Sequence, residues 1–244
     1  MSSGLQAAVA ARVPGAAGLG LLAPPSATVL PATLLADPAW TAERVADLGR
    51  RYRSRDRRVA ATVWWYSVSA VLLTPALAGL ATGRPLSARL ADTSLYALAG
   101  GTLVAATSSA PGGAVADELR ATLGAVIGAV AEAGGMRERP LWAIATDSLA
   151  NRLLALGRAL GDVPAVTALA GPLAAAVGPP LPAPRYVDVH PDGVPGSRPA
   201  VRFTRRVSCC LLYRLPPEPM CTSCPRRDPA ERQFLLEDTA SRMG

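Results

Sequence analysis

One segment, residues 60–83, limits more than any other how this chain can fold, because it carries no charged side chain. It reads "AATVWWYSVSAVLLTPALAGLATG", is long enough to cross a bilayer, and follows the basic run "RRYRSRDRR" at residues 50–58. Its many Ala, Gly, Ser and Thr residues and the internal Pro75 favour a helix inside a protein core instead. We therefore predict a buried core helix and no stable membrane insertion, with a membrane anchor as the alternative.

Composition narrows the class of protein. The 244 residues are half apolar, which excludes a disordered chain and suffices for a sizeable core. The net charge is +7 and every basic residue is arginine, a bias typical of a coding sequence rich in G and C. A charge of this size can attract anionic partners. The arginines at 50–58 lack an RNA-binding or helix-turn-helix pattern, so we predict a solvated helix face and no nucleic-acid partner.

The N-terminal stretch does not resemble a secretion signal. No basic region precedes its apolar residues, and Arg12 interrupts them. We therefore expect a cytoplasmic protein.

Apolar spacing and chain breakers predict an α+β fold, with a mostly helical main domain and a small β-hairpin. Asp37 and Pro38 are typical of a helix start, and Gly100–Gly101 between two short apolar stretches indicates the hairpin. The first predicted helix covers residues 37–56, and the second carries the arginine run into the tryptophans and ends at residue 81. Further helices are predicted at 114–135, at 138–162, in the first part of 164–184, and at 228–243. We predict three regions: a weakly ordered N-terminal leader (1–36), the main domain (37–180), and a linker with a short C-terminal cysteine-rich segment (181–244).

All four cysteines lie in that last region, as Cys209, Cys210, Cys221 and Cys224. A C-x-x-C turn can place two thiolates on one metal, and a second pair completes four ligands. Zinc and a [2Fe–2S] cluster both accept four thiolates. Adjacent cysteines chelate one tetrahedral ion poorly, and a two-iron cluster is wider, so the spacing favours the cluster without excluding a structural zinc site.

The charge around the cysteines favours the same interpretation. Residues 202–232 contain arginines at 202, 205, 206, 214, 226, 227 and 232, against the acids Glu218, Asp228 and Glu231. Positive charge would offset a cluster that is anionic in both oxidation states. Solvated surface arginines are the alternative interpretation.

The stretch "RRVSCCLLYRLPPEPMCTSCP" resembles the C-terminal motif of the FhuF-like ferric siderophore reductases, C-C-x10-C-x2-C. The matching positions are Arg205 or Arg206, Cys209, Cys210, Leu211, Tyr213, Cys221, Cys224 and Pro225. Upstream, "RRVAATVWWYSVSAVLLTPALAGLATG" and "LWAIATDSL" are similar to two helical regions of that family. The resemblance spans about residues 40–228.

The resemblance implies an enzyme that carries a [2Fe–2S] cluster on the four cysteines and reduces siderophore-bound Fe(III) by one electron. No catalytic residue beyond the cluster is implied, and residues 37–180 would be the siderophore-interacting domain. The substrate would be a ferric siderophore, most typically of the hydroxamate type. Electrons would come from an external donor such as a ferredoxin or an NAD(P)H-dependent reductase, because we see no flavin or nicotinamide motif. The alternatives are a zinc-binding interaction module and a cluster protein with another electron acceptor.

Two other features have a functional and a structural interpretation. Trp64, Trp65 and Tyr66 could line a ligand pocket, but core packing is typical of aromatic residues in an apolar helix. His190 is the only histidine, which excludes a His-based catalytic triad and a multi-histidine metal site. A loop histidine without a chemical role is the expected reading.

Overall fold

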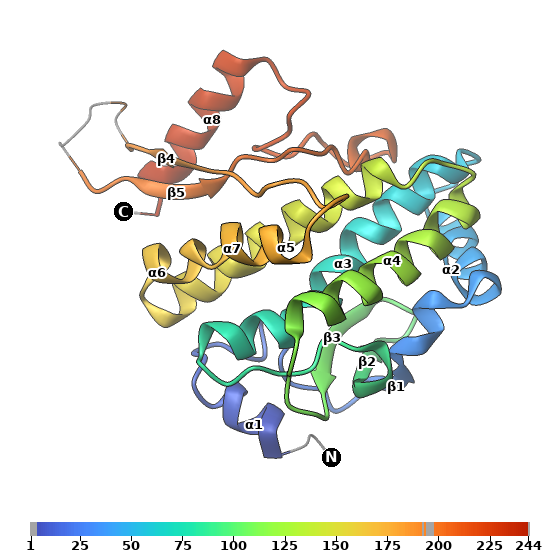
Figure 1. Cartoon of the computed structure of the whole chain (residues 1–244). Helices are drawn as coiled ribbons and strands as arrows, with labels where there is room; N and C mark the ends of the chain where they lie inside the picture. The colour runs from blue at the N-terminus through green and yellow to red at the C-terminus, as the bar shows by residue number, and fades with distance from the viewer. Residues whose placement is uncertain (1–3, 192, 194–197, 244) are drawn as a thin grey trace.

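The computed structural model describes residues 4–191, 193 and 198–243. Its centre is helix α3 (Arg57–Ala81), which packs against α5 (Arg139–Leu160), α4 (Val115–Gly134) and α2 (Pro38–Arg51). Figure 1 shows these helices as the middle layer of the molecule. A three-stranded sheet lies on one side of that layer, and a β-hairpin with the last helix lies on the other.

Helix α3 is the predicted core helix. In its most apolar window 78% of the residues are buried, as in the core helix of a folded domain. Trp65 is fully buried, and its indole Nε1–H donates to the Leu141 carbonyl of α5 at 2.9 Å. Ser69 and Ser148 join the same two helices through a 2.7 Å hydrogen bond. The apolar run at residues 60–83 therefore finds its apolar surroundings within the protein.

Helix α2 begins as its sequence predicts. The Asp37 side chain accepts from the Trp40 backbone N–H at 3.0 Å, and Pro38 occupies the first helical position. The arginine run that was predicted to continue this helix instead contains its end, because α2 stops at Arg51 and α3 starts at Arg57.

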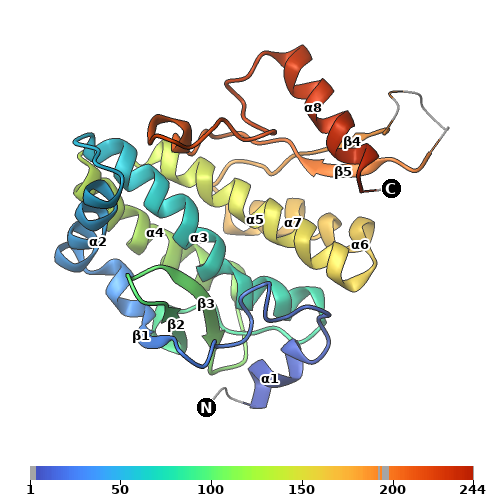
Figure 2. The same ribbon diagram turned by 180° about the vertical axis from the view of Figure 1, so that it is seen from behind.

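The predicted hairpin forms strands β2 (Thr93–Ala97) and β3 (Leu103–Ser108), which pair antiparallel. Gly100 and Gly101 have φ values of 88° and 80°, a region that glycine enters without steric cost. A third strand, β1 (Thr28–Pro31), pairs antiparallel with β2. Figure 2 shows this sheet against the helical layer, where β3 packs on α3.

The prediction of weak order in the N-terminal leader is wrong for residues 4–36. Helix α1 (Gly4–Ala10), strand β1 and the 3-10 turn η1 (Ala32–Ala36) all belong to the packed domain. Val9 and Leu21 are fully buried. Alanine, glycine and proline hide this order in the sequence, because they give no clear apolar period. The boundaries at residues 36 and 180 stay predictions.

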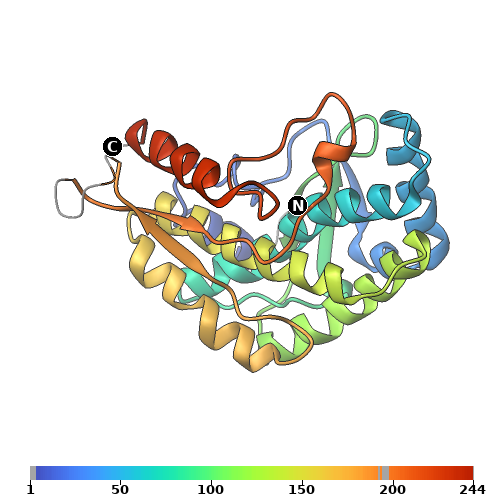
Figure 3. The ribbon, with the colours of Figure 1, turned by 90° about the horizontal axis from the view of Figure 1, so that it is seen from above.

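The C-terminal part packs across α5. After α6 (Val163–Ala168) and α7 (Ala170–Val177) the chain forms strand β4 (Tyr186–Val189), which pairs antiparallel with β5 (Val201–Thr204). The linker predicted here therefore contains a strand. Helix α8 (Pro229–Ser241) lies beside this hairpin, as Figure 3 shows from above. The mostly helical α+β class is confirmed.

Candidate metal centre

The four cysteines lie on the loop between β5 and α8, which we call the cysteine segment (residues 205–228). A 3-10 turn, η3 (Leu212–Arg214), interrupts it. Leu215 is fully buried in a small apolar cluster with Val59 and Val63 of α3. This contact holds the middle of the segment against the start of the core helix.

Asp147 of α5 fixes the segment just before the cysteines. Its carboxylate accepts hydrogen bonds from the backbone N–H of Val207 at 2.8 Å and of Ser208 at 3.0 Å, and from the Ser208 hydroxyl at 2.5 Å. Asp147 is 1% exposed, so these donors replace water as its solvation. One buried carboxylate therefore sets the backbone path into Cys209 and Cys210.

Arg206 joins that carboxylate to the sulfurs. Its Nε–H lies 3.4 Å from Asp147, and both side chains are 2% exposed. Its Nη1 donates toward Cys221 Sγ at 3.3 Å and Cys210 Sγ at 3.8 Å. The guanidinium carbon also lies 5.0 Å from the centroid of the Tyr66 ring, a cation–π contact. A fixed positive charge thus lies beside two of the four thiols.

The thiols form two pairs, each with one member from either end of the segment. The Sγ atoms of Cys209 and Cys224 are 3.9 Å apart, and Cys210 and Cys221 lie within hydrogen-bonding reach. The adjacent residues Cys209 and Cys210 therefore have different partners. Leu211, with φ of 61°, turns the chain sharply after them.

The local charges favour a thiolate at Cys210. The hydrogen bond from Cys221 lowers the pKa of Cys210 to about 5, against the effect of burial, and Arg206 contributes in the same direction. The same hydrogen bond, followed by burial, raises the pKa of Cys221. Burial also raises the pKa of Tyr66, which Arg206 opposes. Burial would lower the pKa of Arg206, but its anionic neighbours raise it.

The distance between the sulfurs of Cys209 and Cys224 fits two thiolates on one metal ion. Two thiolates on one tetrahedral ion with metal–sulfur bonds of about 2.3 Å have their sulfurs about 3.8 Å apart, close to the observed 3.9 Å for Cys209 and Cys224. Among the described residues no group of three or more His, Cys, Asp or Glu side chains surrounds a single point as one ion requires. Four cysteine thiols are a donor set that a two-iron cluster accepts.

The other residues considered in the sequence have separate positions. Trp64 and Trp65 both belong to the main core, and Trp64 together with Tyr66 also lines a cavity of about 250 Å³ between α2, α3 and the β2–β3 turn. His190 follows β4, where its Nδ1 lies 3.2 Å from the Arg198 carbonyl and takes no part in the cysteine site. The role of Asp147 was not predicted from the sequence. The available signal was an acid among the apolar residues of the helix predicted at 138–162.

These features define the class: a helical α+β protein with a C-terminal cysteine segment whose thiols are paired beside a buried arginine. Residues 206–226 match the family model of the FhuF 2Fe-2S C-terminal domain. The resemblance to the FhuF-like family is thereby confirmed for this segment, and with it the [2Fe–2S] cluster as cofactor. The resemblance of the upstream helices stays a prediction. Neither the curated proteins nor the solved structures gave a match to the chain.

Proposed function

We propose that this protein is a ferric-siderophore reductase. Siderophores hold Fe(III) through hard oxygen donors, and the same donors bind the softer Fe(II) far less tightly, so one electron releases the metal. The bound cluster supplies that electron. The observation that carries the proposal is the family match over the segment that holds all four cysteines.

The cluster ligands in this proposal are Cys209, Cys210, Cys221 and Cys224. Cys209 and Cys224 would bind one iron, and Cys210 and Cys221 the other, because the sulfurs are paired in this way. Asp147 holds the backbone of the segment, and the Arg206 guanidinium would offset the negative charge of the cluster. Cys209 and Cys221 are partly exposed, which leaves an edge of the centre open to an electron acceptor.

The partners and location in the proposal follow from the same reasoning. The substrate is a ferric siderophore, for which a ferric trishydroxamate is the first compound to test. The electrons come from an external donor such as a ferredoxin or an NAD(P)H-dependent reductase. The protein works in the cytoplasm, consistent with an apolar helix that is mostly buried.

The test starts with protein purified without oxygen. We expect a red-brown protein with about two irons and two sulfides per chain. After chemical reduction, a ferric siderophore, tested as a trishydroxamate and as a carboxylate-bearing chelate, should reoxidise the cluster, and an Fe(II) chelator should trap one iron for each electron lost. A reduced cluster that passes its electron to other acceptors but not to ferric siderophores would contradict the reductase assignment.

Cys221→Ser tests the ligands. We expect weak or altered cluster absorption and loss of the reduction step. Thr222→Ala is the matched control, because it changes the next residue without removing a sulfur. Cys210→Ser should alter the same iron as Cys221→Ser, whereas Cys209→Ser and Cys224→Ser should alter the other. Mössbauer spectra resolve the two irons, and a different grouping of the four variants would reject the pairing.

A further inference from the structure

A cleft of about 620 Å³ opens beside the cysteine segment, between the β4–β5 hairpin and α8. Ser223 and Pro225, the neighbours of Cys224 on either side, belong to its wall. Arg206, which donates toward Cys221, also lines it. Its volume is typical of pockets for small organic ligands. A molecule in this cleft would lie directly against the segment that holds the cluster.

The lining of the cleft is strongly basic. Arg185, Arg205, Arg206 and Arg232 contribute to it, and no Asp or Glu does. Arg185 and Arg205 are exposed, and neither forms an ion pair with a described residue. Arg232 is held in place, because its Nη1 donates to the carbonyl oxygens of Arg227 at 3.4 Å and Cys224 at 3.5 Å.

Two buried polar atoms in residues of this wall have no partner in the described part of the chain. They are Nη2 of Arg206 and Oγ1 of Thr204. The side chain of Arg206 is 2% exposed, and Thr204 is 5% exposed. Buried polar groups are normally hydrogen-bonded, so these two atoms leave unsatisfied hydrogen-bonding capacity in residues of the cleft wall. An anionic oxygen would satisfy the guanidinium, and the hydroxyl could donate to the same ligand.

We propose that this cleft binds the ferric substrate, and that it selects a chelate with net negative charge, such as one bearing free carboxylates. This inference rests on the proposed function. A neutral ferric trishydroxamate would leave the arginines without counter-charge, whereas carboxylates can accept two hydrogen bonds from one guanidinium. The arginines also offset the repulsion between an anionic chelate and the anionic cluster.

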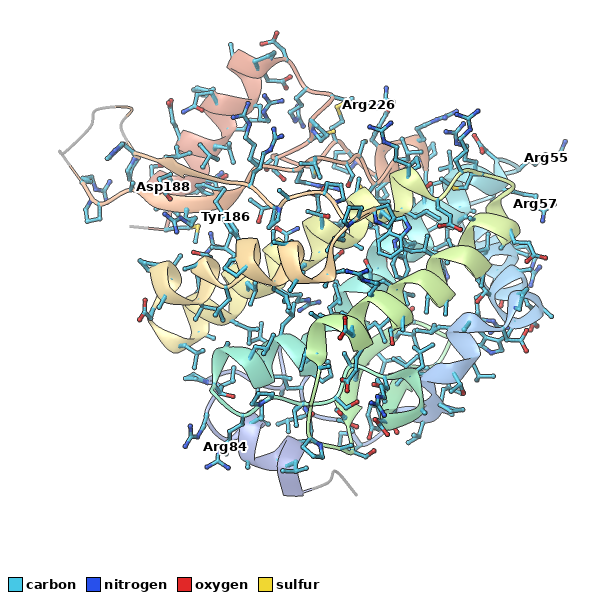
Figure 4. The ribbon with its side chains drawn as sticks, in the orientation of Figure 1. Arg55, Arg57, Arg84, Tyr186, Asp188 and Arg226 are labelled. Atoms are coloured by element: carbon cyan, nitrogen blue, oxygen red, sulfur yellow. The ribbon has the colours of Figure 1, made fainter. Side chains whose placement is uncertain are left out.

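The other large cavities lack this combination. A cavity of about 680 Å³ at the α2–α3 corner has Arg50, Arg53, Arg55 and Arg57 in its wall but no residue of the cysteine segment. Figure 4 shows Arg55 and Arg57 at that corner. The cavity of about 250 Å³ beside Tyr66 reaches the segment only at Leu212, and Asp47 is part of its wall. Among the described cavities, only the basic cleft combines residues next to a cysteine with several arginines and no acidic residue in its wall.

The experiment separates binding from reduction by replacing iron with gallium, because Ga(III) has nearly the same coordination chemistry and accepts no electron here. Calorimetric titration of the cluster-loaded, oxidised protein compares a carboxylate-bearing Ga(III) chelate with a neutral Ga(III) trishydroxamate. The anionic chelate should bind more tightly, and its affinity should fall as salt concentration rises.

The variant Arg185→Gln/Arg205→Gln removes two exposed charges from the cleft. We expect it to weaken binding of the anionic chelate at least about tenfold, since charge-assisted hydrogen bonds of ordinary strength are lost. The matched control is Arg84→Gln/Arg226→Gln, which lowers the net charge equally. Figure 4 shows Arg84 at the far end of the molecule and Arg226 in the loop before α8, and neither lines the cleft. The visible spectrum verifies that each variant keeps its cluster.

The outcomes distinguish a wrong substrate site from a wrong reductase function. Equal losses in the two double variants, or tighter binding of the neutral chelate, would overturn the proposed site. If the Ga(III) chelate binds as expected but the reduced protein does not reduce the matching Fe(III) chelate, the anion site stands and the reductase function fails. If reduction proceeds unchanged in Arg185→Gln/Arg205→Gln at low substrate concentration, the function stands and the cleft is not its substrate site.

Discussion

A single carboxylate, that of Asp147, carries much of the organisation of the cysteine segment. It accepts from two successive backbone N–H groups and a hydroxyl, and it is the counter-charge of Arg206. The pair is buried, and removing one member of a buried ion pair leaves the other charge without compensation. The intact pair therefore adds little net free energy of folding, whereas loss of either Asp147 or Arg206 costs much of it.

Asp147→Ala should lower the free energy of unfolding by about 3 kcal/mol. It should also weaken cluster retention, because the backbone before Cys209 loses its acceptor. Chemical denaturation and the iron content measure the two effects. Asp238→Ala is the control, since Asp238 pairs with Arg242 on the surface of α8 and should contribute under about 1 kcal/mol. Similar losses in both variants would contradict the role of Asp147.

Arg206 should tune the reduction potential. Its positive charge stabilises the reduced cluster more than the oxidised one, because the reduced form has one more negative charge. We expect Arg206→Gln to lower the midpoint potential on the order of 50 mV, the equivalent of a hydrogen bond's free energy for one electron. The midpoint potential of Arg206→Lys should lie between those of Arg206→Gln and the natural protein.

Arg214→Gln is the control for that shift. Arg214 lies in the same segment but is exposed and pairs with Asp56 rather than a sulfur. Protein-film voltammetry reports the potential of each variant. A shift of equal size for Arg214→Gln would mean that general charge, and not the contact to the sulfurs, sets the potential.

At the scale of elements, the contact between α3 and the cysteine segment is apolar and local. Leu215 fills the space against Val59 and Val63, two residues of the helix start. Pro216, Pro217 and Pro219 stiffen the loop after the turn, but the contact of Leu215 decides where the loop lies. Helix α3 thus packs with one face in the main core and with another face against the cysteine segment.

Leu215→Ala should cost about 2–5 kcal/mol, because it leaves a cavity between the segment and α3. If the cysteine segment opens before the main core unfolds, the lower stability of Leu215→Ala will appear as faster hydrogen exchange in residues 205–228. Leu98→Ala, at a side chain that is 38% exposed, is the control and should change stability little. Unchanged exchange in the segment would show that the thiol site is held without this contact.

At the scale of the whole molecule, the main apolar core contains none of the cysteines. It joins α1 through α7 and the three-stranded sheet, whereas α8 and the β4–β5 hairpin share a smaller core around Val189, Leu236 and Ala240. The cluster site therefore lies outside the region that stabilises most of the fold. Figure 1 shows this part above the helical layer.

Removing the cluster with a chelator and reductant should leave the helical circular dichroism nearly unchanged. The segment around the cysteines should lose order, because cofactor binding and local folding are coupled. Limited proteolysis should then cut between residues 205 and 228 before any site in the helices. A large loss of helical signal on cluster removal would contradict this division.

The sequence by itself determined the features whose cause is local. The charge-free run predicted the buried core helix, Asp37–Pro38 predicted the start of α2, and Gly100–Gly101 predicted the hairpin. The cysteine spacing favoured a two-iron cluster over zinc, and the family motif on the same residues implied that cluster. Each of these features is recorded in one continuous stretch of the chain, so a local pattern can reveal it.

Only the tertiary structure decided the rest. The partner of each thiol, the carboxylate of Asp147 near residues some sixty positions later, and the pairing of β1 with β2 all join segments that are distant in the chain. The basic cleft likewise combines arginines from the hairpin, the segment and α8. Such contacts depend on how elements pack, and a local pattern contains no information on which distant residues meet.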